Sequence, residues 1–230
     1  MPPLTLGGAD VTETSEHDRR QPAPAVAAAA RVTLVPGTAL LLVRHGESVA
    51  NAERRFTRDE HEPLTEQGVA QARRTALRLA ESCSAVALYS SPYRRAHHTA
   101  LEIGSRLRLE PRIDQRLYEQ GFGELTGRPY GDYFGRHAHV AGAGRWRLAA
   151  PGGESLEQVA GRVGPAIAEI ACRHPGQAVV VVSHGGVMAA LRLWAHGDFE
   201  SAPVPTENAG GYRLVVGSGG AWFGPPEPLF

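Results

Sequence analysis

Residues 39–48 read Ala-Leu-Leu-Leu-Val-Arg-His-Gly-Glu-Ser, so that a purely apolar run passes directly into charged and small residues. An uninterrupted apolar run of this length is typical of a strand that is buried on both faces of a sheet. The abrupt change at Arg44 and His45 marks the carboxyl end of that strand. The stretch therefore predicts a buried strand that brings polar side chains to one edge of a parallel sheet.

Apolar segments of the same kind recur along the chain, and helical patterns separate them. Strand-length runs occupy residues 85–89, 178–182 and 212–216, with a weaker one at 109–113. Apolar residues spaced by three and four positions predict helices within 69–79, 96–107, 156–170 and 187–194. This alternation indicates an α/β fold in which helices pack on a parallel sheet.

The composition is that of a soluble globular protein. The 230 residues suit one domain, or one domain with a tail, and 42% hydrophobic with 21% charged residues is ordinary for such a chain. Because 24 basic residues are balanced by 24 acidic ones, we expect no nucleic-acid partner. No apolar stretch has the roughly 20 residues that a membrane span needs, so we expect no membrane association. Cys83 and Cys172 fit no zinc or disulfide pattern, and free thiols favour a cytoplasmic location.

We expect three parts along the chain. Residues 1–36, rich in alanine, proline and threonine, are predicted to be a disordered tail, residues 37–217 the folded domain, and residues 218–230 a C-terminal tail. Within the domain, residues 121–153 have no clear period and are rich in glycine, tyrosine, arginine and histidine. A loop of that length usually serves function or moves. We interpret it as a lid or specificity segment over the site, and a plain surface excursion is the alternative.

Polar residues follow three of the predicted strands. Arg-His-Gly occupies 44–46, Ser-Ser-Pro-Tyr-Arg-Arg occupies 90–95 and Ser-His-Gly-Gly occupies 183–186. Carboxyl ends of parallel strands share one edge of a sheet, so we expect these side chains to converge. Arginine grips phosphoryl oxygens through a planar fork of donors, and a neutral histidine can attack phosphorus. The combination points to a phosphate ester as ligand, although either histidine taken alone could be an ordinary loop residue.

Five motifs in order resemble the signature of the histidine phosphatase superfamily, also called the phosphoglycerate mutase-like family. They lie at residues 42–51, 63–68, 91–100, 116–123 and 182–186, and Pro-Gly-Gly-Glu-Ser at 151–155 precedes the helix that leads to the last of them. The resemblance covers roughly residues 39–216. It implies a single-domain three-layer α/β/α sandwich with a mostly parallel sheet.

The resemblance also implies a role for each matched residue. His45 matches the nucleophile that carries the phosphoryl group, and Arg44 and Arg95 match the two arginines that grip it. His184 matches the second histidine, which donates to the phosphoryl oxygens, and Glu119 matches the proton donor to the leaving group. The implied mechanism has two displacements and needs neither a cofactor nor a metal, because the cationic side chains already supply positive charge.

The second arginine has a competitor, since Arg94 precedes Arg95 directly. We prefer Arg95 because the family motif places its arginine immediately before an alanine, here Ala96. Substrate-binding roles are expected at five further positions, which are Ser48, Asn51, Thr57, Arg58 and Gly185. Arg58 lies in a loop where the family usually has a glycine. It could bind a second anionic group of the substrate or simply be solvated.

The leading hypothesis is a phosphomonoester hydrolase that acts on a small phosphorylated metabolite through a phosphohistidine on His45. A sugar phosphate, a phosphoglycerate-like acid and a nucleotide all remain open, and the sequence does not define the oligomeric state. One alternative is phosphoglycerate mutase-type phosphotransfer, which the short segment between the acidic motif and His184 disfavours. The other is a non-catalytic phospho-ligand-binding module. His97 with His98, and His137 with His139, form only weak candidate metal sets.

Overall fold

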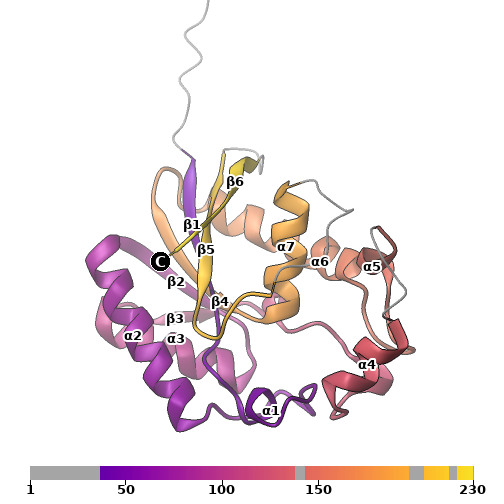
Figure 1. Ribbon diagram of the computed structural model, residues 1–230. Coiled ribbons are helices and arrows are strands. Elements are labelled where there is room, and N and C mark those ends of the chain that lie inside the picture. Colours follow the sequence, from indigo (N-terminus) through magenta and orange to yellow (C-terminus); the bar gives the residue numbers. More distant parts are fainter. Residues whose placement is uncertain (1–36, 138–142, 197–204, 218–221, 230) are drawn as a thin grey trace, which may run out of the picture. The chain divides into compact units, whose positions relative to one another are not determined.

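The computed structural model describes residues 37–137, 143–196, 205–217 and 222–229, and the predicted tail at 1–36 lies outside these ranges. One sheet organises the described residues (Figure 1). Its strands are β1 (Thr38–Arg44), β2 (Ala85–Ser90), β3 (Pro111–Ile113), β4 (Ala178–Ser183), β5 (Gly211–Val216) and β6 (Trp222–Pro228). They lie in the order β3-β2-β4-β1-β5-β6. The four strands from β3 to β1 are parallel, whereas β5 and β6 are antiparallel to their neighbours.

Helices cover both faces of the sheet. The longer ones are α2 (Glu66–Ser82), α3 (Arg94–Leu107), α6 (Leu156–Cys172) and α7 (Gly185–His196). Leu40 and Leu42 of β1 belong to one buried cluster with residues of α6 and α7, and Leu41 and Val43 belong to a second with residues of α2 and α3. This alternation follows from the period of two along a strand. Figure 1 shows the two helix pairs on opposite sides of the sheet, so the three-layer α/β/α prediction is confirmed.

The segment predicted as a lid contains short helices. It holds the 3₁₀ turn η2 (Gly123–Leu125), α4 (Tyr130–His137) and α5 (Ala143–Arg147), and residues 138–142 between the two α-helices lie outside the described ranges. Two further short elements, α1 (Val49–Ala52) and the 3₁₀ turn η1 (Gln115–Leu117), lie in loops at the carboxyl ends of strands.

The C-terminal region differs from the prediction of a tail at 218–230. Residues 222–228 form β6, which pairs with β5. The sequence Trp-Phe-Gly-Pro-Pro-Glu-Pro does not predict a strand, because proline cannot donate a hydrogen bond to the neighbouring strand. An edge strand tolerates proline.

Among the described residues, no helix combines the length and apolar character that a membrane crossing requires.

Candidate active site

His45 lies directly after β1 and is almost fully buried. Its backbone N–H donates to the Ser183 carbonyl at 2.9 Å, which ties the residue to the end of β4. The ring Nδ1 lies 2.6 Å from the Gly46 carbonyl oxygen, and a carbonyl can only accept, so Nδ1 carries the proton. Nε2 is then the basic nitrogen, and it accepts a hydrogen bond from Arg95 Nε at 3.2 Å. A buried, unprotonated Nε2 can act as a nucleophile once Arg95 releases it.

His184 is fully buried at the end of β4, with its ring centroid 5.2 Å from that of His45. Its Nε2 lies 2.6 Å from Ser91 Oγ, and Ser91 Oγ itself accepts from the backbone N–H of Tyr93 at 3.3 Å. We assign the Ser91 hydroxyl as the donor to Nε2 of His184, which is one of the two directions that this contact allows. Nδ1 of His184, which has no hydrogen-bond partner within the described ranges, is then a buried N–H donor.

The two predicted arginines reach the same place from different elements. Arg44, the last residue of β1, donates from Nη1 to the Thr206 carbonyl, while its buried Nε has no hydrogen-bond partner among the described residues. Arg95, in the first turn of α3, is 2% exposed and also donates to Thr57 Oγ1 at 3.3 Å. Arg94 is exposed to solvent. The structure thus places Arg95, and not Arg94, against His45.

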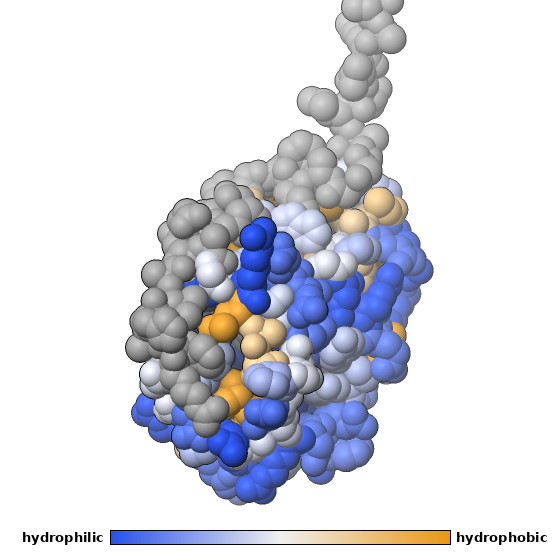
Figure 2. Space-filling model, turned by 90° about the vertical axis from the view of Figure 1, so that its right-hand side faces the viewer, coloured by the Kyte–Doolittle hydropathy of each residue, from blue (hydrophilic) through white to orange (hydrophobic). Residues whose placement is uncertain are grey.

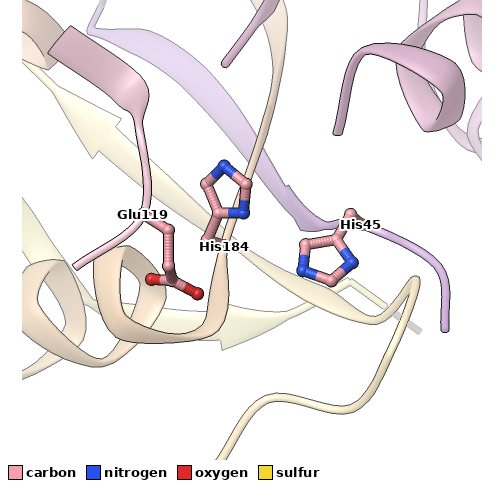
Figure 3. Close-up of side chains that lie close together, drawn as sticks. All are labelled: His45, Glu119 and His184. Atoms are coloured by element: carbon pink, nitrogen blue, oxygen red, sulfur yellow. The ribbon is translucent and has the colours of Figure 1, made fainter. Parts of the chain in front are cut away.

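Glu119 supplies a buried carboxylate opposite the histidines. Its Oε1 accepts from the backbone N–H groups of Gln120 and Gly186, at 2.9 and 3.0 Å. A Cβ on Gly186 would lie 2.7 Å from that oxygen, so only glycine permits this approach of α7. One donor atom each from His45, Glu119 and His184 lie within 4.8 Å of one another, and Figure 3 shows these three side chains side by side. A metal ion could fit this triad by geometry, but Arg44 and Arg95 would repel a cation there.

Arg162 of α6 fixes the loop that carries Glu119. Its Nη1 donates to the carbonyls of Arg116 and Tyr118, and its Nη2 donates to the carbonyl of Glu119, all at 3.0 Å. Its Nε and Nη2 also bind both carboxylate oxygens of Glu154 at 2.8 Å. All five N–H donors of the guanidinium are therefore used, and the group lies 3.5 Å from the centroid of the Tyr118 ring. Nothing in the sequence pattern pointed to Arg162, because its partners are backbone carbonyls 43 to 46 residues away.

Burial and positive charge keep both histidines neutral. Burial lowers the pKa of His45 well below its ordinary range, with further lowering by Arg95 and Arg44, and the hydrogen bond to Gly46 opposes the shift only in part. The pKa of His184 is likewise well below its ordinary range, first through burial and then through Arg95. An imidazole that stays neutral keeps its lone pair available for attack on phosphorus.

A cavity of about 270 Å³ opens onto these groups. Of the five predicted substrate-binding residues, Ser48, Asn51, Thr57 and Gly185 line it. Arg58 does not belong to the lining; it is exposed, and its stem would lie 3.1 Å from a Cβ on Gly127.

Ser48 and Asn51 also stabilise the local backbone. They form the reciprocal capping box that begins α1. Asn208, which the sequence reading missed, donates to both the His45 carbonyl and Asn51 Oδ1. Thr206 was missed as well and lines the cavity. Both residues precede β5, outside every recognisable motif.

The fold and the site together define a phosphate-handling α/β enzyme. The family model of the histidine phosphatase superfamily (branch 1) matches residues 40–223, and the chain belongs to this superfamily. A metal-independent phosphoserine phosphatase of Arabidopsis thaliana is 37% identical over 168 residues, which is 68% of each chain. A glucosyl-3-phosphoglycerate phosphatase of Mycobacterium tuberculosis is 34% identical over 66% of this chain and 72% of its own.

Solved structures agree with this assignment. A mycobacterial glucosyl-3-phosphoglycerate phosphatase in complex with VO₃ superposes with a TM-score of 0.69 at 30% identity, over 76% of this chain and 92% of that one. A protein described as mycobacterial hydrolase 1 gives a TM-score of 0.72 at 28% identity, over 83% and 95% of the two chains. The predictions of the family, of the fold and of a phosphatase are thereby confirmed.

Proposed function

We propose that this phosphatase hydrolyses a small phosphorylated metabolite through a phosphohistidine on His45. The observation that carries the proposal is the unprotonated Nε2 of the buried His45, which faces Arg95 at the wall of the cavity with Glu119 and His184 beside it. A phosphoryl group at Nε2 would meet the guanidinium groups of Arg44 and Arg95 and the Nδ1 donor of His184. These donors match the oxygens on which negative charge spreads during phosphoryl transfer.

In the first displacement, the Nε2 lone pair of His45 attacks phosphorus as the bond to the ester oxygen breaks. The Nε–H of Arg95, which occupies Nε2 in the free protein, turns to a phosphoryl oxygen. Glu119, in its acid form, gives its proton to the departing oxygen, and the alcohol leaves. Glu119 stays in place because backbone N–H groups and Arg162 hold its loop.

In the second displacement, water attacks the phosphohistidine. Glu119, now a carboxylate, accepts a proton from the water while the phosphorus–nitrogen bond breaks and its electron pair returns to Nε2 of His45. Inorganic phosphate leaves, and the enzyme regains its starting protonation state. Arg44 and Arg95 supply the positive charge throughout, so the scheme requires no metal.

The free thiols of Cys83 and Cys172 favour a cytoplasmic setting for this reaction.

Relatives suggest how broad the substrate range is. Two are named for phosphoserine and glucosyl-3-phosphoglycerate, both small phosphate monoesters, which supports a small metabolite such as a phosphoglycerate-like acid or a sugar phosphate. A nucleotide remains within the same chemical class. Phosphate release from a panel of such esters tests the proposal. The wild type should release phosphate, His45→Ala should lose at least about a thousandfold in kcat, and His98→Ala, at a half-buried position on α3, should behave as wild type.

Mutase activity is the second candidate, because a 2,3-bisphosphoglycerate-dependent phosphoglycerate mutase of Azorhizobium caulinodans is 36% identical over 66% of this chain. Incubation with one phosphoglycerate isomer separates the two reactions. Hydrolysis yields inorganic phosphate, whereas a mutase yields the other isomer with the phosphate retained. A protein that does neither, but still binds phosphate esters, would instead be a binding module.

A further inference from the structure

A second cavity of about 260 Å³ adjoins the catalytic one. The two share part of their walls, since Phe56, Gln120, Phe122, Gly186 and Pro205 line both. Figure 2 looks at the side of the molecule that carries α4 to α7 and shows apolar surface gathered among hydrophilic residues there. We call this second space the outer cavity.

The outer cavity lies on the leaving-group side of the reaction. Gln120 directly follows Glu119, and both Gln120 and Gly186 give backbone hydrogen bonds to the Glu119 carboxylate. The same two residues line both cavities. An ester oxygen that receives its proton from Glu119 therefore has the body of its alcohol beside Gln120 and Gly186. The outer cavity adjoins this position.

The walls of the outer cavity are mainly apolar and aromatic. Besides Phe56 and Phe122, they include Leu125, Tyr133, Leu148 and Leu156. The Phe56 ring lies 4.6 Å from that of Phe122 and 6.0 Å from that of Tyr133, centroid to centroid. Such a wall gains free energy by removing apolar surface from water and can stack against a ring.

The charged groups of the outer cavity are already engaged. Glu154 accepts hydrogen bonds from Nε and Nη2 of Arg162 and from the Gly121 N–H. Arg145, the cation among the described lining residues, makes its own interaction within the protein. A carboxylate-bearing leaving group would therefore lose water here and displace an existing contact to gain a partner.

We propose that the physiological substrate is a phosphate monoester of a hydrophobic alcohol or phenol, whose apolar body fills the outer cavity. This inference rests on the proposed hydrolase function and narrows its substrate class. The proposed substrate class differs from phosphoserine and glucosyl-3-phosphoglycerate, the polar acids for which two relatives are named.

A matched pair of esters tests the inference. Hexyl phosphate and 6-phosphonooxyhexanoate have the same primary-alcohol leaving group and differ in whether the far end is a methyl or a carboxylate. We expect kcat/KM for hexyl phosphate to exceed that for the acid at least tenfold. Along the series from ethyl to hexyl phosphate, kcat/KM should rise roughly threefold per methylene.

A variant that fills the outer cavity supplies the second test. Ala189 lies on α7, lines the outer cavity and is partly exposed at the edge of the core, so Ala189→Phe removes volume from this cavity. It should abolish the advantage of hexyl over ethyl phosphate while retaining turnover of ethyl phosphate. Ala70→Phe, on the exposed face of α2, is the matched control and should leave the chain-length series unchanged.

The outcomes separate this inference from the function on which it rests. Preference for the carboxylate ester, or for O-phosphoserine over hexyl phosphate, overturns the apolar substrate class and leaves hydrolysis intact. If Arg145→Gln also abolished that preference, the outer cavity would be an acid site. Absence of phosphate release from every ester would overturn the hydrolase itself.

Discussion

At the scale of single residues, the site depends on the proton positions of two buried histidines. The Gly46 carbonyl fixes the proton of His45 on Nδ1, and a Ser91 hydroxyl that donates to Nε2 of His184 leaves the proton of His184 on Nδ1 as well. One histidine thereby presents a base and the other a donor. Ser91 was not predicted, because a serine after a strand carries no signal until its partner is known. Arg95 was preferred to Arg94, and the structure buries Arg95 beside His45 and exposes Arg94.

The burial of His45 next to Arg95 predicts that its pKa lies below the ordinary histidine value. Because burial and then Arg95 lower its pKa, His45 should stay neutral as the pH falls through the ordinary histidine value of about 6.5. The unfolded chain binds this proton more readily, so the free energy of unfolding should decline below that pH. NMR titration of the labelled histidines measures the pKa directly. Arg95→Met should raise it, and a His45 that titrates at or above 6.5 in the wild type contradicts this description.

At the scale of elements, Arg162 connects α6 to the loop that carries Glu119. Its bonds to three backbone carbonyls and to Glu154 hold residues 116–121 against the sheet. The helix itself was predicted from its apolar spacing, and its capping box at Ser155 begins it where expected. The helices α4 and α5 were not predicted, because the segment 121–153 is rich in glycine and shows no apolar period.

Substitution of Arg162 should mainly slow the step in which Glu119 protonates the leaving group. Arg162→Met should lower turnover of an alkyl phosphate, whose leaving oxygen needs a proton, by roughly 100-fold. The rate of the 4-nitrophenol burst from 4-nitrophenyl phosphate should fall by less than about tenfold, because this leaving group needs little protonation. The ratio of the two rates is independent of how much protein is folded. Equal losses on both substrates would mean that Arg162 has a purely structural role, and exposed Arg106→Met is the control.

At the scale of the whole described sheet, the parallel strands bring motifs that are distant in the sequence to one edge. The antiparallel strands β5 and β6 extend the sheet beyond β1. The register of β1 with β4 places Arg44 opposite Ser183, so that His45 and His184 follow at the same edge. The recurrence of polar residues after apolar runs predicted this convergence. Strand order and the antiparallel direction of β5 were not predictable, because a buried strand has the same apolar pattern in either direction. Thr206 and Asn208 were missed for that reason.

The pairing of β6 with β5 predicts a stability effect. Deletion of residues 218–230 would expose the ladder edge of β5 and remove the contact of Leu229 with the cluster around Leu41 and Val43. The midpoint of thermal unfolding should fall by roughly 5 °C or more, with a greater tendency to aggregate. Deletion of an equal length at residues 2–14 should leave the midpoint unchanged. An unchanged midpoint after the C-terminal deletion would show that β6 contributes nothing to the sheet.

The central claim is that His45 carries the phosphoryl group. Rapid quenching of the wild type during turnover of a radiolabelled phosphate ester, followed by digestion and mass spectrometry, locates the label. We expect an acid-labile, alkali-stable phosphohistidine at His45, formed before steady-state phosphate release, present in His98→Ala and absent in His45→Ala. A label on another residue, or full turnover by His45→Ala, would contradict it.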